Sequence, residues 1–583
     1  MPCYSLNLQP TAKPAERAPE PSISPAQRLL AAVLNTWDWL AVRRLAPVLY
    51  AVLALIATLV MVEAPHRTHR WAPDTFLFLD GGWRVYNGQR PYVDFYAALG
   101  PVTFQLVALG LWLGGVSAAA IDYGFGVAAI ALGVWAWWLF GKRMESPAAL
   151  LLALFVAVLT IAPHALGARL DILTYASLYN RLGYALVIIV LVEAVCAPVA
   201  DSMKDEWAGG ISSGAACLLL LFVKPSFFLI AVPMLAASYL FRDLRRLRRT
   251  LGLAVGFAIP AVLMLAYLRF DAGAIWYDFR TLAAARTSPI NNDPAFLIGP
   301  RTVLKHAYDH AEELAGLLLL SWMAAILPRA KRTIVFLDGW WPVAAAAAVV
   351  AADLALNTGN GVQYSLPLIA AMAVVLVSTV FRWWRSAELS KRGEYRWLCG
   401  FSLVLGFALF APQPLNDIAT LAYSARQSTA GPALLPHFQA APLRRLLSRE
   451  TPPDWDEDPY NGKSLIDPIN DGTSLLESAS RPQESVIALS PVNPFSFALR
   501  RKPAEGGCPY LGAGFFNPGH MPPHEWMIGG ADLLMVPKKQ TKADAWLKEV
   551  FGDYVERKYT LAAQSNDWWL YRRTRPVTPA SWN

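Results

Sequence analysis

Long apolar runs alternate with short loops rich in lysine and arginine between residues 45 and 411 of this chain. An apolar run of membrane-spanning length satisfies its backbone polar groups inside a bilayer by forming an α-helix. The composition agrees, because 55% hydrophobic and 16% charged residues are too apolar a mixture for a soluble globular protein of 583 residues. The sequence therefore predicts a polytopic α-helical membrane protein.

The positive charge of the chain reflects topology rather than nucleic-acid binding. The formal net charge is +8, but the basic residues gather in short loops between apolar runs, as the arginines of 242–249 do. Such clusters mark the cytoplasmic side of a membrane protein. The five cysteines show no CxxC spacing, so no disulfide framework or cysteine metal site is implied.

The sidedness of the chain follows from its first basic cluster. Residues 1–44 are polar and rich in proline and alanine, and they end at Arg43 and Arg44. They predict a cytoplasmic, partly disordered N-terminal tail before a retained span at 45–62. The loop at 63–118 then faces outward.

The remaining spans follow from the same rule. We interpret the glycine-interrupted run 101–115 as interfacial, since it then places Lys142 and Arg143 inside. The run 209–240 lies between two cytoplasmic-type loops, so it predicts two short spans with Lys224 at the outer turn. About eleven spans result, with the N-terminus inside and the C-terminus outside. The predicted spans are 45–62, 119–140, 147–163, 182–198, two within 209–240, 251–270, 314–327, 340–356, 362–381 and 398–411.

The segment 412–583 differs from the apolar region before it. It is polar and rich in proline and aromatic residues, and three short runs alternate in the way that strands do. These predicted strands are 485–489, 532–536 and 568–571, and a helix is predicted at 543–559. The sequence thus predicts three parts: the tail at 1–44, the transmembrane domain at 45–411, and a small α/β domain on the outer face at 412–583.

Three carboxylates stand in the first outer loop, directly after the first span. Asp74, Asp80 and Asp94 are candidates for chemistry on a substrate that the membrane delivers. The spacing from Asp74 to Gly88 predicts a short helix that ends at a glycine turn, and the following turns would fold Asp94 back near Asp74. Each carboxylate could equally be a solvated loop residue or, for Asp94, a helix cap.

This loop resembles the first outer loop of the GT-C glycosyltransferases, which take sugars from polyprenyl-phosphate carriers. The match looks closest to a bacterial branch that includes rhizobial lipopolysaccharide transferases and relatives of aminoarabinose and protein O-mannosyl transferases. The two short spans hinged at Lys224-Pro225 also resemble that group. The matching loop positions are Asp74, Gly82, Gly88, the run 91–95 and Pro101.

The loop also departs from the family pattern. An acidic residue often follows the first aspartate of the family, whereas this chain has Thr75, and Gly100-Pro101 replaces the usual double proline. Asp80 is an additional carboxylate that could take the catalytic role instead of Asp74.

The resemblance implies a division of roles among these residues. Asp74 would be the general base, which implies inversion at the anomeric carbon, and Asp94 would position the acceptor or join a metal site. Lys224 and Arg181, both predicted at the outer boundary, would bind the phosphate of the donor. Each could instead serve only to anchor a span end. Whether a divalent cation assists is left open, since cationic side chains can stabilise a leaving phosphate as well.

The resemblance thus implies an integral membrane glycosyltransferase of the hexosyl or pentosyl class. Its donor would be a polyprenyl-phosphate-linked sugar, and its acceptor a lipid-linked glycan, lipopolysaccharide, polysaccharide or protein. It would be a multi-pass protein of the bacterial inner membrane, with a periplasmic C-terminal domain and no nucleic-acid partner. Two alternatives remain: a glycolipid flippase, which would need ionisable residues at mid-membrane, and a non-catalytic assembly partner of an envelope-polysaccharide system.

Overall fold

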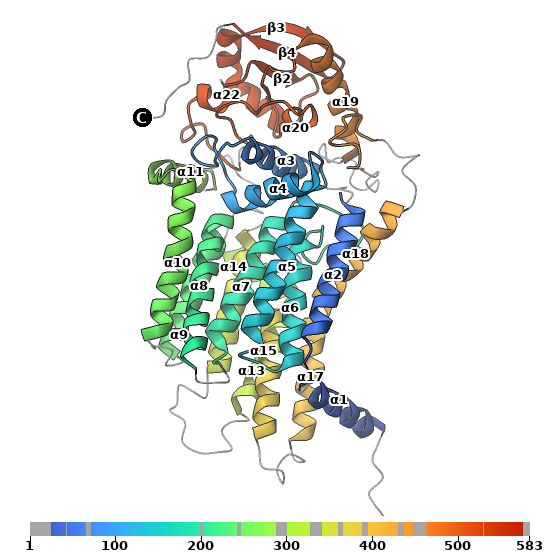
Figure 1. The fold of residues 1–583 in the computed structure, drawn as a ribbon, viewed down its shortest axis with the longest axis vertical. Coiled ribbons are helices and arrows are strands. Elements are labelled where there is room, and N and C mark those ends of the chain that lie inside the picture. Colours follow the sequence, from blue (N-terminus) through green and yellow to red (C-terminus); the bar gives the residue numbers. More distant parts are fainter. Residues whose placement is uncertain are drawn as a thin grey trace, which may run out of the picture.

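The computed structural model places a helical bundle beneath a small C-terminal domain (Figure 1). The described residues are 25–41, 44–65, 71–198, 202–241, 247–286, 300–326, 341–359, 365–386, 395–429, 437–446, 462–512, 514–528 and 530–574.

The bundle consists of helices packed side by side, most of them apolar (Figure 1). They are α2 (Ala46–Glu63), α5 (Ala120–Phe140), α6 (Ser146–Ile161), α7 (Leu178–Val195), α8 (Met203–Val223), α9 (Pro225–Phe241), α10 (Leu247–Tyr267), α13 (Ala311–Ile326), α14 (Trp341–Gly359), α15 (Pro367–Ser386), α17 (Arg396–Phe410) and α18 (Pro412–Thr429).

Length and hydropathy identify the helices that can cross a bilayer. Within the described residues, five helices qualify singly, and α17 with α18 qualifies as a pair bent by 42°. The five are α5, α7, α8, α10 and α15. The chain is therefore a membrane-spanning helical protein, as expected, although the number of eleven spans is not confirmed. Several expected spans, among them α2, α6, α9 and α14, are shorter apolar helices.

Glycines allow two of these helices to approach closely. Gly210 and Gly214 of α8 face Gly252 and Gly256 of α10, and a Cβ at Gly256 would overlap the backbone of Ile211. Small residues at this four-residue spacing let helix backbones pack tightly in a membrane. The expected break at Lys224 is also present, since α8 ends at Val223 and α9 begins at Pro225.

The segment after α2, expected to be the first outer loop, forms a layer across the end of the bundle that lies next to the C-terminal domain (Figure 1). We call this end of the bundle the outer end. The segment contains α3 (Ala72–Tyr86) and α4 (Pro101–Gly114), and α11 (Ala272–Arg286) lies in the same layer. The position of α4 agrees with the expected interfacial segment. The expected glycine turn also ends α3, because Gly88 has a φ of 88°. The N–H groups of Gly88 and Gln89 donate to the carbonyls of Val85 and Arg84, the pattern of a Schellman motif.

The C-terminal domain is a four-stranded mixed sheet between two helices. The strand order is β1-β2-β4-β3, with β1 and β2 parallel and the other neighbours antiparallel. Its elements are α19 (Gly462–Ala479), β1 (Val486–Ala488), α20 (Phe495–Ala498), α21 (His524–Ile528), β2 (Leu533–Pro537), α22 (Lys542–Lys558), β3 (Tyr559–Gln564) and β4 (Trp568–Arg573).

Alternation along β2 explains why the sheet is covered on both faces. Leu533 and Met535 pack in the apolar cluster that contains Leu476 of α19, whereas Leu534 packs with Phe551 of α22. Successive strand residues point to opposite faces, so one short apolar strand serves two cores. All three expected strands and the expected helix are present, while β3 begins at Tyr559, where the expected helix ended.

Two helices change the expected boundaries. Helix α1 (Pro25–Ala41) lies within the segment expected to be a tail, and its Trp37 donates a hydrogen bond to Glu145 and packs on Phe381. Helix α18 continues α17 and runs alongside α2 within the bundle (Figure 1). The expected boundary at 412 thus falls inside a bent helix pair, and the change to the C-terminal domain comes after Thr429. Helix α12 (Pro300–Asp309) completes the described elements.

Candidate functional site

Asp74 occupies the first turn of α3, at the outer end of the bundle. Pro73 at the helix start supplies no N–H, and the carboxylate of Asp74 lies close to the positive end of the helix dipole. The side chain is partly exposed, and the surrounding protein raises the pKa of Asp74 to about 7 through desolvation. A carboxylate with such a pKa can accept a proton near neutral pH.

A short series of contacts leads from the helix of Asp74 to Lys224. Phe78 lies one turn after Asp74 on the same face of α3, and its ring is 6.3 Å from the ring of Tyr179. The Lys224 ammonium is 5.1 Å from the centre of the Tyr179 ring and donates a 3.2 Å hydrogen bond to Asn180 Oδ1. Tyr179 thus contacts both the α3 face that carries Asp74 and Phe78, and the ammonium of Lys224, which is partly exposed.

Lys224 owes its place to the break between α8 and α9. The backbone of Lys224 is extended at the end of α8, with φ −164° and ψ 120°, and Pro225 begins the next helix. The outer loop docks directly on this break, because Gly100 N–H donates to the Val223 carbonyl at 3.2 Å. A Cβ at Gly100 would overlap the Phe222 carbonyl, which explains why this position is glycine.

Asp94 stands in a tight turn. Its carboxylate accepts a 2.7 Å hydrogen bond from the Arg90 N–H and forms a 3.4 Å ion pair with Arg269. Next to it, the Phe95 ring lies 5.3 Å from the Arg84 guanidinium. The loop therefore folds back on the carboxyl-terminal part of α3, about 15 Å along the helix from Asp74 at 1.5 Å per residue. The described partners of Asp94 are Arg90, Arg269 and Gly506. The expected proximity of Asp94 to Asp74 stays a prediction.

Asp80 is enclosed by protein and paired with a neighbour on its own helix. Its side chain has no exposed surface, and Oδ2 accepts a 2.9 Å hydrogen bond from Arg84 Nε. An acceptor hydroxyl cannot reach a carboxylate in that position. The structure therefore does not support Asp80 as a substitute base.

Arg181 is likewise enclosed, behind the face that carries Lys224. The guanidinium donates to the His164 and Leu159 carbonyls and forms a 3.0 Å ion pair with Asp417 of α18. A donor phosphate would have to displace Asp417 from a site with no exposed surface. Arg181 therefore pairs with Asp417 inside the protein, whereas Lys224 is partly exposed. This holds although the hydrogen-bond partner of Lys224, Asn180, is the neighbour of Arg181 at the start of α7.

The sequence interpretation missed three residues at this outer end. Asp278 of α11 is buried and accepts a 2.9 Å hydrogen bond from the Ala97 N–H, and desolvation holds its pKa well above the usual range. Arg84 could have been found from its four-residue spacing to Asp80, which suits a helical ion pair. Arg269 could have been found as a cation on the outer side, where the positive-inside rule expects few.

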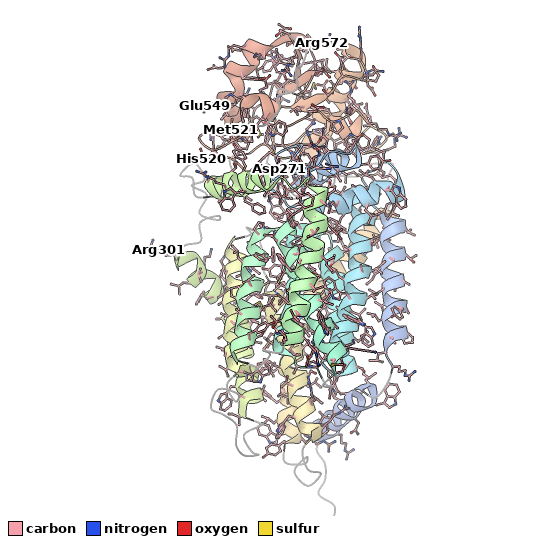
Figure 2. The ribbon with its side chains drawn as sticks, turned by 60° about the vertical axis from the view of Figure 1, so that its left-hand side comes forward. Asp271, Arg301, His520, Met521, Glu549 and Arg572 are labelled. Atoms are coloured by element: carbon pink, nitrogen blue, oxygen red, sulfur yellow. The ribbon has the colours of Figure 1, made fainter. Side chains whose placement is uncertain are left out.

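The C-terminal domain covers this layer. Figure 2 shows Asp271 at the junction of α10 and α11, beneath the part of the C-terminal domain that carries His520 and Met521. The segment 501–507 contacts both α3 and the Asp94 turn through the hydrogen bonds of Trp83, Arg84, Gln89 and Asp94.

A metal site was left open by the sequence. Within the described ranges, no group of three or more His, Cys, Asp and Glu side chains is arranged to hold a metal ion.

Two buried acidic residues inside the bundle accept hydrogen bonds from neighbouring helices or form ion pairs with them. Glu193 of α7 pairs with Arg143 and Arg249 near the inner end, and Asp353 of α14 accepts the N–H groups of Leu368 and Ile369. These contacts tie helices together at buried positions.

The fold resembles solved structures of membrane enzymes. Two are ArnT from Cupriavidus metallidurans, in the apo state and bound to undecaprenyl phosphate, with TM-scores of 0.39 and 0.42, 12% identity, and 90% of this chain and 97% of that chain covered. A third is the oligosaccharyltransferase AglB from Archaeoglobus fulgidus in complex with an inhibitory peptide and a dolichol-phosphate, with a TM-score of 0.30, 13% identity, and 65% and 56% covered.

No protein-family model and no curated protein matches the sequence. With TM-scores below 0.5 and identities of 12–13%, the chemistry of this chain has to be argued from its own residues.

Proposed function

We propose that this protein is a membrane glycosyltransferase that moves a sugar from a polyprenyl-phosphate-linked donor to a hydroxyl acceptor at the outer face. The observation that carries the proposal is the carboxylate of Asp74, partly exposed and with a pKa of about 7, on the face of α3 that contacts Tyr179 beside Lys224. Such an arrangement offers a base and a phosphate-binding cation where a lipid-borne donor meets water.

The reaction follows from these two groups. Asp74 takes the proton of the acceptor hydroxyl while its oxygen attacks the anomeric carbon. The bond from that carbon to the phosphate oxygen breaks, and the polyprenyl phosphate leaves with the electron pair. The ammonium of Lys224 stabilises the negative charge that develops on the phosphate. One direct displacement inverts the configuration at the anomeric carbon.

The remaining candidates act through structure or positioning in this proposal. Asp94 shapes the turn that meets the acceptor, with Arg269 as its partner. Asp80 and Arg181 are parts of the protein framework, because neither side chain has exposed surface.

We place the reaction on the periplasmic side of a bacterial inner membrane, with the N-terminus cytoplasmic. The supporting observation is that the polar layer and the C-terminal domain share one end of the bundle, opposite to α1 (Figure 1). The acceptor class is a lipid-linked glycan, lipopolysaccharide, polysaccharide or protein, and the transferred group is a hexose or pentose.

The test is transfer in proteoliposomes supplied with labelled polyprenyl-phosphate sugars and a panel of acceptors. Asp74→Asn should reduce transfer at least about a hundredfold, as loss of a general base does. Lys224→Gln should raise the donor KM about tenfold or more, as loss of a charged hydrogen bond does.

Asp171→Asn is the matched control, since Asp171 is an exposed carboxylate of another outer loop that pairs with Arg169. It should transfer at the wild-type rate. Wild-type transfer by both Asp74→Asn and Asp94→Asn would refute the mechanism. Passage of the labelled lipid across the membrane without transfer would support the flippase alternative instead.

A further inference from the structure

The buried side chain of Arg84 joins three parts of the outer end: helix α3, the turn that follows it at Gln89, and the C-terminal domain. Its Nε donates to Asp80 at 2.9 Å, and its Nη1 donates to the carbonyls of Ala504 and Gly506 at 3.1 and 2.7 Å. Only 1% of the residue is exposed. Burying a charge is costly unless it is paired and hydrogen-bonded, so the contacts of the Arg84 fork favour this arrangement. The other carboxylate oxygen of Asp80, Oδ1, is buried without a hydrogen-bond partner among the described residues.

The C-terminal segment that Arg84 binds also holds the turn of Asp94. The Gly506 N–H donates to the Asp94 carbonyl at 3.0 Å, and the Gly507 carbonyl accepts the Tyr96 N–H at 3.0 Å. Gly507 has a φ of 84°, and a Cβ there would approach Arg84 Nη2 to 3.0 Å. The segment 504–507 is thus fitted to α3 on one side and to the Asp94 turn on the other.

Neighbouring contacts reinforce the same joint. Trp83 Nε1 donates to the Arg501 carbonyl at 2.8 Å, and Gln89 Nε2 donates to the Ala504 carbonyl at 2.9 Å. Both residues belong to α3 or its terminal turn, which also carries Asp74 at the opposite end. A shift of 504–507 would therefore be transmitted to Asp74 along a rigid helix and to Asp94 through a backbone hydrogen bond.

We propose that Arg84, oriented by Asp80, is a positioning residue through which the C-terminal domain sets the placement of Asp74 relative to Asp94 and Lys224. This inference rests on the proposed function, and it assigns Asp80 a task in the site other than that of a base. Arg84 does not touch the substrate.

The test compares Arg84→Lys with Arg501→Lys. A lysine can keep the charge but not the planar fork that serves Asp80 and two carbonyls together. Arg501 is the matched control, because it is a buried arginine whose side chain donates to the carbonyls of Arg481, Glu484 and Leu476 within the C-terminal domain. Among the described residues, the hydrogen bonds of its side chain stay within the C-terminal domain, and only its backbone carbonyl, which the substitution keeps, accepts from Trp83 of α3. A loss in Arg501→Lys therefore reports the stability of the domain.

Arg84→Lys should lower kcat about tenfold to a hundredfold, the effect of misplacing reactive groups by about 1 Å, with the donor KM within about twofold of wild type. The half-maximal pH of kcat should fall, because a loosened α3 admits water to Asp74. Arg501→Lys should reduce the amount of active protein without moving the pH profile. Equal kcat values and pH profiles for Arg84→Lys and wild type would overturn the inference.

Hydrogen exchange separates this failure from failure of the proposed function. In Arg84→Lys, amides of 72–101 should exchange at least about tenfold faster than in wild type, while those of β2 and α22 should not change. Unchanged exchange in 72–101 would refute the joint whether or not transfer is detected. Absence of transfer by the wild-type protein, with faster exchange in the variant, would refute the proposed function and leave the joint intact.

Discussion

At the scale of single residues, the environment of Asp74 and Asp80 separates two carboxylates that look equivalent in the sequence. Both lie on α3, six positions apart, but one is partly exposed and the other is enclosed with Arg84. A general base has to be reachable by the acceptor and has to hold its proton weakly enough to be free at working pH. Asp74 meets both conditions, and Asp80 fails the first.

The pKa of Asp74 predicts how transfer responds to acidity. Desolvation raises this pKa to about 7, so the carboxyl group is protonated below that pH and is free to accept a proton above it. We expect kcat to rise with pH and to be half-maximal near pH 7. Initial rates at saturating donor and acceptor, from about pH 5 to about pH 9, would measure this. A half-maximal rate at about pH 3.9, the pKa of aspartate in a model peptide, would contradict it.

At the scale of elements, α8 and α10 pack tightly against each other through facing glycines. Their glycines bring the backbones together, and one of these helices ends at Lys224 while the other leads to Arg269. The polar groups of the outer end are therefore carried by a pair with little freedom to slide.

Gly256→Leu should destabilise the protein through this pair. The added side chain would overlap the backbone of Ile211, which cannot move aside as a side chain can. Overpacking of this kind costs about 1–3 kcal/mol or more. We expect a lower apparent Tm in detergent, followed by tryptophan fluorescence.

Gly552→Ala is the matched control in a helix interior. A Cβ at Gly552 of α22 would meet nothing within 4 Å, so alanine should stabilise the C-terminal domain by about 0.4–1 kcal/mol. An equal loss of stability in both variants would contradict the steric explanation.

At the scale of the whole molecule, the ion pair of Arg181 and Asp417 joins α7 to α18, two helices far apart in the sequence. Asp417→Ala should cost about 3–5 kcal/mol, because it leaves a buried guanidinium without its charge partner. Thermal unfolding would measure the loss. The remaining folded enzyme should keep a donor KM within about twofold of wild type, whereas a large rise in KM would return Arg181 to the phosphate site.

Local sequence patterns predicted most of the fold, but they did not predict which candidate site residues are buried. The break at Lys224, the glycine turn at Gly88 and the strands of the C-terminal domain follow from hydropathy, proline and glycine signals that act over a few residues. The burial of Asp80 and Arg181 could not be predicted, because it depends on Ala504, Gly506 and Asp417, which are distant in sequence. The hydropathy pattern along the chain does not predict contacts between residues so far apart in the sequence.

The joint between α3 and the C-terminal domain also has a consequence for biosynthesis. Trp83 and its partner Arg501 are separated by 418 positions, so α3 emerges from the ribosome long before the segment that binds it. Until nearly the whole chain has been made and the C-terminal domain has folded, Arg84 lacks the carbonyls of Ala504 and Gly506. A nascent chain that has not yet reached residue 506 would therefore lack these partners of Arg84, and under the proposed function its site would be incomplete.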